Sequence, residues 1–92
     1  MMVQNLRTNN MTLTKDILIS YLALLGIYDH SIRESDDQDL GHILVLSIPR
    51  NNNNVGRLLG KHGRNEKILG QFLHVCAGAE GVDLKLVVKL LD

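Results

Sequence analysis

Two glycines three residues apart, Gly60 and Gly63, lie between two stretches whose apolar residues recur at helical spacing. Glycine adopts backbone conformations that other residues avoid, so this pair predicts a sharp reversal of the chain between two helices. The second helix begins with N–H groups that have no partner within the helix, and its dipole places positive charge at that end. Lys61, His62 and Arg64 add cationic side chains beside it. This combination favours a loop that holds an anion such as a sugar-phosphate backbone.

Length and composition predict one small globular domain. The 92 residues suffice for a single modest core, and a hydrophobic fraction of 45% with 22% charged residues excludes a disordered chain. Aromatic residues make up only 3% (Tyr21, Tyr28 and Phe72), so the core is aliphatic. The chain therefore lacks the several aromatic side chains that stack nucleobases on the sheets of RRM and OB domains.

The charges are balanced in number and separated along the chain. Ten basic and ten acidic residues give a net charge of zero. The basic cluster is Arg50, Arg57, Lys61, Arg64 and Lys67, and the acidic cluster is Asp29, Glu34, Asp36, Asp37 and Asp39. Because the basic cluster coincides with the glycine loop, a neutral chain can still present a basic face to a phosphate chain.

Cysteine content and hydropathy bear on location. A single cysteine, Cys76, excludes an internal disulfide and fits a reducing compartment. Residues 1–11 are polar and predict a flexible leader rather than a signal peptide. The longest apolar region, residues 17–27, is too short to span a bilayer. We expect a cytoplasmic protein without a membrane segment.

The first half of the chain predicts one helix and a hairpin. Apolar residues recur at helical spacing over residues 14–25, with Thr14 as the N-cap, Asp16 in the first turn and Gly26 as the stop. Residues 29–36 predict a short edge strand, and the acidic stretch 36–41 predicts a turn. Residues 42–48 are almost all aliphatic and predict a central strand that Pro49 ends.

The second half predicts two helices and a strand. Asn53 or Asn54 caps a short helix over residues 55–59. The helix after the glycine loop contains Gly70, which costs roughly 1 kcal/mol relative to Ala and indicates a close helix approach, and Gly81 ends this helix. Its predicted core face is Ile68, Phe72, Val75, Cys76 and Ala79. The last strand places Val82, Leu84, Leu86, Val88 and Leu90 on one face.

These elements give the order α-β-β-α-α-β. The strands over residues 42–48 and 84–90 are joined by a crossover of two helices, so we expect them to pair in parallel. The first strand pairs with the central strand as a hairpin. The predicted fold class is α+β, with a three-stranded mixed sheet covered on one face by helices.

This order, with the glycine loop between the paired helices, resembles a type II (prokaryotic) KH domain. The stretch Val55-Gly56-Arg57-Leu58-Leu59-Gly60-Lys61-His62-Gly63-Arg64 is similar to the signature loop of short stand-alone bacterial KH proteins, the KhpA-like family. The ending Ala79-Glu80-Gly81-Val82 before a terminal strand also resembles that family. The resemblance covers residues 12–92, which we treat as the KH domain.

The resemblance implies single-stranded RNA binding, in a post-transcriptional or ribosome-related role. In such domains the glycine loop holds the backbone of about four nucleotides, and the bases lie in an adjacent apolar groove. Val55, Leu59 and a side chain near Val87 would line that groove. The implied RNA-binding residues are Gly56, Arg57, Leu59, Gly60, Lys61, His62, Gly63, Arg64 and Lys67. The family also implies self-association or pairing with a larger KH-containing protein.

Enzymatic and metal-binding alternatives fit the sequence poorly. The stretch Gly56–Lys61 superficially resembles a phosphate-binding P-loop, but its spacing is one residue short and His62 stands where Ser or Thr holds magnesium. The four histidines are scattered, and His74 and Cys76 fall on different helix faces. We therefore predict no enzyme activity, no cofactor, no metal and no small-molecule substrate.

A protein-binding module that keeps the KH fold with weak or no RNA affinity is the alternative function. Ile43 and Val45 fall on the opposite strand face from Leu44 and Leu46, and Val87 and Leu91 fall opposite the core face of the last strand. Either this face is covered within the domain, or it is an apolar surface for a partner. Cationic side chains around the glycine loop favour RNA binding over this alternative.

Overall fold

The computed structural model describes residues 11–92, and residues 1–10 of the predicted leader (residues 1–11) lie outside that range. The elements are α2 (Thr12–Leu24), β1 (Ser31–Asp37), β2 (Gly41–Pro49), α3 (Val55–Leu59), the 3-10 turn η1 (Lys61–Gly63), α4 (Arg64–Ala79) and β3 (Leu84–Leu91). The predicted order α-β-β-α-α-β is confirmed, with η1 inserted at the glycine loop. Met11, the last residue of the predicted leader, is buried at the start of α2. No helix within residues 11–92 combines the length and the apolarity needed to cross a bilayer.

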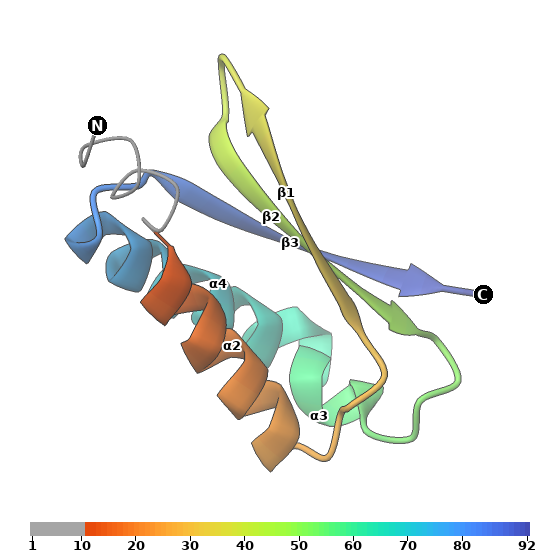
Figure 1. The fold of residues 1–92 in the computed structure, drawn as a ribbon. Helices are drawn as coiled ribbons and strands as arrows, with labels where there is room; N and C mark the ends of the chain where they lie inside the picture. The colour runs from red at the N-terminus through yellow and green to blue at the C-terminus, as the bar shows by residue number, and fades with distance from the viewer. Residues whose placement is uncertain (1–10) are drawn as a thin grey trace.

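The sheet has three strands in the order β1-β2-β3. β2 is central, as its aliphatic sequence predicted; it pairs antiparallel with β1 and parallel with β3. Figure 1 shows the helices on one side of this sheet, with the β1–β2 hairpin extending beyond the helix layer. The predicted turn is confirmed, because Asp37 Oδ1 accepts hydrogen bonds from the backbone N–H groups of Asp39 and Leu40.

The core lies between the sheet and the helices. Alternate residues of β2 are buried against the helices, as period-two alternation in a strand requires. The fully buried side chains of the core include Leu18, Leu22, Ile27, Leu44, Leu46, Ile48, Leu58 and Leu73. None of these side chains is aromatic, so the core is aliphatic as predicted.

The predicted core face of α4 is wrong by one residue. Leu69, Leu73 and Ala77 are the buried side chains of this helix, whereas Phe72 is 52% exposed. Ile68 and Val75 are exposed as well, Ala79 is exposed, and Cys76 is half-buried. Both sets of residues satisfy helical spacing, so periodicity alone could not choose between them.

A carboxylate from the far end of the chain caps the start of α2. Thr14 is not the N-cap; the cap position is Met11, which offers no side-chain hydrogen bond. Glu80, which follows the last turn of α4, accepts hydrogen bonds from the backbone N–H groups of Leu13 (3.2 Å) and Thr14 (2.9 Å) and from the Thr14 hydroxyl. It thereby satisfies donors that a helix start leaves unpaired, and it joins α2 to α4.

Two glycines end helices as predicted. Gly26 has φ of +80° and Gly81 has φ of +85°. After α2 the Ile27 N–H donates to the Leu22 carbonyl at 2.8 Å, and after α4 the Val82 N–H donates to the Ala77 carbonyl at 2.9 Å. Both ends are therefore Schellman motifs, in which a left-handed residue lets the chain satisfy the last helical carbonyls.

Asn54 occupies the predicted cap position of α3 but acts differently. Its side chain makes no cap hydrogen bond to α3; its amide donates to the Gly26 carbonyl at 3.2 Å. The backbone N–H of Asn54 is bound by Asn52 Oδ1 at 2.8 Å. The asparagine run therefore ties the start of α3 to the end of α2.

A charge network fixes the hairpin to α2. His42 on β2 lies between two carboxylates of β1: its Nε2 is 2.9 Å from Glu34 Oε1, and its Nδ1 contacts Asp36. Glu34 also pairs with Lys15 of α2. Glu34 foremost, and Asp36 as well, raise the pKa of His42 above its ordinary 6.5, against the lowering effect of partial burial. Lys15 first, and then His42, lower the pKa of Glu34.

We predict that Glu80→Ala lowers the free energy of unfolding by about 1–2 kcal/mol, because the donors at the start of α2 lose their acceptor. The Thr14 hydroxyl foremost lowers the pKa of Glu80 below its ordinary 4.5. The stabilisation is therefore present above pH 4.5 and is lost as the pH falls through the folded pKa. Urea unfolding at about pH 7 and about pH 3 measures both effects. The control is Asp39→Asn; equal stabilities of the two variants at neutral pH would refute the cap.

We predict that His42 makes stability fall as the pH rises above neutrality. Since the folded pKa of His42 lies above 6.5, its stabilisation is complete below 6.5 and is lost as the pH rises through the folded value. In His42→Gln the unfolding midpoint should lose this dependence between about pH 6 and pH 8. Urea unfolding across that range, with the His42 titration followed by NMR, measures it. A folded-state pKa at or below 6.5 would contradict the network.

Candidate nucleic-acid interface

The chain reverses between α3 and α4 through backbone angles that favour glycine. Gly60 has φ of +74° and ψ of +175°, and Gly63 has φ of +71°. Between them His62 also has positive φ, +57°, in the left-handed region that histidine tolerates better than bulkier side chains. Gly60 and Gly63 are thus required by conformation. Gly56 is different, because its φ is not positive and its surroundings leave a side chain room.

Asn65 closes the loop against Gly60. A Cβ atom at residue 60 would lie 2.6 Å from Asn65 Cγ and 2.8 Å from its backbone nitrogen, so no side chain fits there. The Asn65 amide donates to the Arg57 carbonyl at 3.1 Å, which satisfies a carbonyl near the end of α3. Asn65 was not predicted as a site residue, because no rule of residue spacing identifies a side-chain amide whose hydrogen-bond partner lies on the preceding helix.

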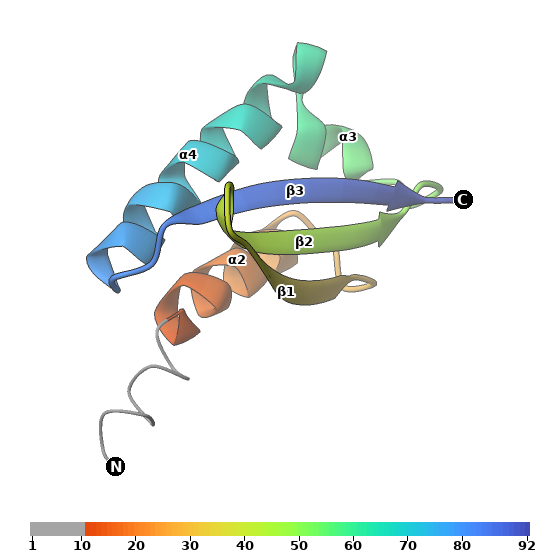
Figure 2. The ribbon, with the colours of Figure 1, turned by 90° about the horizontal axis from the view of Figure 1, so that it is seen from above.

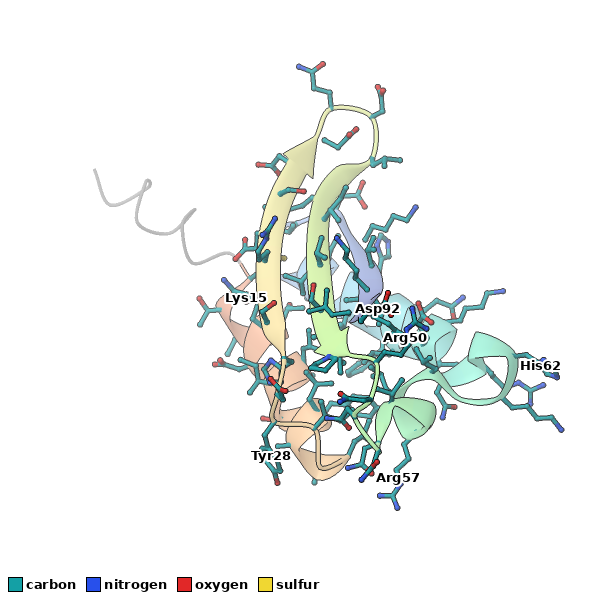
Figure 3. The ribbon with its side chains drawn as sticks, turned by 90° about the vertical axis from the view of Figure 1, so that its right-hand side faces the viewer. Lys15, Tyr28, Arg50, Arg57, His62 and Asp92 are labelled. Carbon is teal, nitrogen blue, oxygen red and sulfur yellow. The ribbon has the colours of Figure 1, made fainter. Side chains whose placement is uncertain are left out.

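The predicted cationic residues gather around this loop. Arg57, Lys61, His62, Arg64 and Lys67 are all exposed, and within residues 11–92 none of them takes part in an ion pair. Figure 3 shows His62 at the tip of the loop and Arg57 on α3, both projecting away from the body of the molecule. The start of α4 has no side-chain cap, and Glu66 is the acidic residue of its first turn. The loop therefore offers cations and a helix N-terminus at one end of the domain.

A groove of about 760 Å³ runs between α4 and β3 and begins at the loop. Gly63 and Lys67 belong to both the loop and the groove. The further lining residues are Leu40, Glu66, Gly70, Gln71, His74, Val75, Asp83, Leu84, Lys85 and Leu86. From Gly63 to His74 the helix provides a wall about 16 Å long. On the strand side Leu84 and Leu86 are aliphatic. Glu66 and Lys67 lie at the loop end of the groove, and Asp83 and Lys85 at the other end.

Gly70 leaves the floor of the groove open. α4 is continuous through Gly70 and ends before Gly81, as predicted. The close approach predicted at Gly70 is absent within residues 11–92, because a Cβ atom at residue 70 would be 3.9 Å from Leu86 Cβ of β3, an ordinary contact across the groove. His74 joins the two walls farther along, since its Nδ1 donates to the Leu84 carbonyl at 2.8 Å. Because a carbonyl oxygen only accepts, Nδ1 carries the hydrogen in this contact.

The three side chains predicted to line the groove lie elsewhere or at its margin. Val55 is only 8% exposed and belongs to the core, and Leu59 is half-buried against it. Val87 lies on the face of β3 that points away from the helices, and its neighbour Leu86 lies in the groove. Within residues 11–92 no group of three or more histidine, cysteine or acidic side chains is arranged to hold a metal ion.

Two of the predicted site residues, Gly63 and Lys67, line the groove. The others lie on α3, in the loop and at the start of α4; Leu59 and Gly60 are half-buried, and the rest are exposed. Comparisons with known proteins give no matching family model, no matching curated protein and no matching solved structure. The resemblance to KH domains thus stays a prediction from the residues of the glycine loop and the order of the elements.

Proposed function

We propose that this chain binds single-stranded RNA as a type II KH domain. The observation that carries the proposal is the junction of α3 and α4, where two glycines with positive φ expose Lys61 and His62 beside the groove. A phosphate chain can approach such a backbone closely, and the uncapped start of α4 provides N–H donors for it. A cytoplasmic setting and a post-transcriptional or ribosome-related role belong to the same proposal.

The placement of charge supports binding of the phosphates at the loop and of the bases in the groove. Arg57, Lys61, His62 and Arg64 lie around the loop and take part in no ion pair within residues 11–92, which supports holding the phosphates there. In the groove the carboxylates of Glu66 and Asp83 offset the cations of Lys67 and Lys85, whereas Gly70 and Leu86 give the groove an apolar floor that suits bases. None of the three aromatic side chains lines the groove, so the bases are held by apolar packing and hydrogen bonds rather than by stacking on aromatic rings.

A protein-binding role is the second candidate, and the helices carry an observation in its favour. Ile17 of α2 and Ile68 and Phe72 of α4 are exposed around an apolar hollow of about 330 Å³. Exposed apolar clusters of this kind mark surfaces that bind other proteins. A second copy of the chain or a larger KH-containing partner, as the resemblance implies, would use such a surface without involving the loop cations.

We predict that Lys61→Asp with His62→Asp leaves the fold intact and weakens RNA binding at least about tenfold, because two anions then face the phosphates. Fluorescence anisotropy with a short single-stranded RNA measures the affinity, and circular dichroism measures the fold. For the unmutated chain, three to four contacted phosphates imply that log affinity falls by roughly 2–3 per tenfold rise in salt. Unchanged affinity in the folded double variant would refute the loop as the site.

We predict that Gly70→Leu blocks the groove and leaves the loop unchanged. The new side chain would extend toward Leu86 across the groove, so RNA affinity should fall at least about tenfold while the fold is retained. Gly70→Ala is the matched control; it should stabilise the helix by up to about 1 kcal/mol and change affinity less than about twofold. If Gly70→Leu binds RNA as tightly as Gly70→Ala, bases do not occupy the groove.

A further inference from the structure

The strand pairing defines a second surface on the side of the sheet that the helices leave uncovered. Residues paired across strands point to the same face, so the rows Ser35–Ile43–Lys85, Arg33–Val45–Val87 and Ser31–Ser47–Lys89 lie together. We call these residues the open face. Figure 2 looks on to it, with the strands in front of α2.

The open face is cationic although the chain is neutral. Arg33, Lys85 and Lys89 are exposed, and within residues 11–92 none of them takes part in an ion pair. Lys85, on the edge strand β3, also borders the groove. Two carboxylates border the hairpin end of this face. Asp37 pairs with Gly41, and its Oδ1 accepts hydrogen bonds from backbone N–H groups of the turn. Asp83 precedes Lys85 by two residues, and its Oδ2 lies 3.4 Å from the position that a Cβ atom of Gly41 would take. An anionic occupant is therefore attracted over the middle of the sheet, near Arg33 and Lys89, and repelled at the hairpin end.

The centre of the open face is aliphatic. Ile43 and Val45 are half-buried, and Val87 is 38% exposed, although all three lie on the face opposite the core. The possibility that this face is covered within the domain is excluded for residues 11–92, because α2, α3 and α4 all lie on the other side. Apolar side chains flanked by cations suit an occupant that has an apolar ridge as well as negative charge.

The dimensions of the open face match one α-helix. Arg33 on β1 and Val87 on β3 are two strand spacings apart, about 10 Å, which is close to the diameter of a helix with its side chains. Lys85 and Lys89 are four residues apart on β3, about 13 Å, so they can contact acidic residues two to three turns apart on one flank of a helix. Arg33 serves the opposite flank.

We propose that the open face binds an acidic amphipathic helix of a partner protein, with the aliphatic ridge of that helix on Ile43, Val45 and Val87. A second copy of this face fits poorly, because the cations of the two copies would meet. RNA fits less well than a helix, since the open face has no aromatic side chain for stacking bases and its aliphatic centre gains nothing from a phosphate chain. The proposal is independent of RNA binding at the loop.

The test is an NMR titration of the full chain with a synthetic helical peptide of about 14 residues, in which glutamates flank a leucine ridge. Saturable shifts at the methyl groups of Ile43, Val45 and Val87 are expected. The same peptide with lysines in place of the glutamates should leave these signals unchanged. Arg33→Glu with Lys89→Glu should weaken binding of the acidic peptide at least about tenfold in a folded protein.

A matched variant with the charges reversed at the loop separates the two surfaces. Arg57→Glu with Lys67→Glu should weaken RNA binding and leave peptide binding within about twofold of the unmutated chain. The proposal is overturned if the acidic peptide gives no shifts on the open face, if the lysine peptide binds equally well, or if short RNA displaces the peptide from these methyl groups.

Discussion

The reversal of the chain at residues 60–63 is the constraint on which the site depends. α3 ends at Leu59 and α4 begins at Arg64, so the direction of the main chain changes within four residues. Positive φ at Gly60, His62 and Gly63 makes that change, and the contact of Asn65 with Gly60 leaves no space for a side chain. The same geometry exposes the cations of the loop and places the uncapped start of α4 at the mouth of the groove. A substitution that moved the reversal would displace both parts of the site together.

Distant contacts hold this arrangement. Glu80 joins the start of α2 to the end of α4, Asn54 joins the end of α2 to the start of α3, and His74 joins α4 to β3. These hydrogen bonds fix the helices relative to one another and to the sheet, and thereby the width of the groove. Charge is then distributed over separate surfaces: cations at the loop and on the open face, and carboxylates at the hairpin. A chain of zero net charge thus presents two basic surfaces of different chemistry, one beside a groove and one around an aliphatic centre.

Local chemistry made much of the fold predictable. Gly26 and Gly81 as helix stops, Asp37 in the hairpin turn, and the aliphatic central strand all follow from residues close in sequence, and the structure confirms them. Prediction failed where two faces of a helix fitted the sequence pattern equally well, or where the hydrogen-bond partner of a residue lay far along the chain. The predicted buried face of α4 was wrong, because Phe72 and Leu73 both fit a helical period. Which of the two is buried depends on where the sheet lies. The predicted N-cap of α2, Thr14, was wrong. The carboxylate that accepts hydrogen bonds from the start of α2 belongs to Glu80, which lies far along the chain from Thr14. The loop residues were predicted from glycine spacing, whereas Asn65 and the open floor at Gly70 depend on contacts between elements that spacing does not report.

The most direct test of the central claim is an NMR titration of the labelled chain with a pool of short single-stranded RNAs at low salt. The account predicts that the backbone signals of residues 57–67 shift together with those of Gly70, His74 and Leu86, which line the groove. Signals of Val45 on the open face and of Phe72 on the outer side of α4 should stay in place. A folded protein whose loop and groove signals do not respond to RNA would contradict the assignment of this junction as a nucleic-acid site.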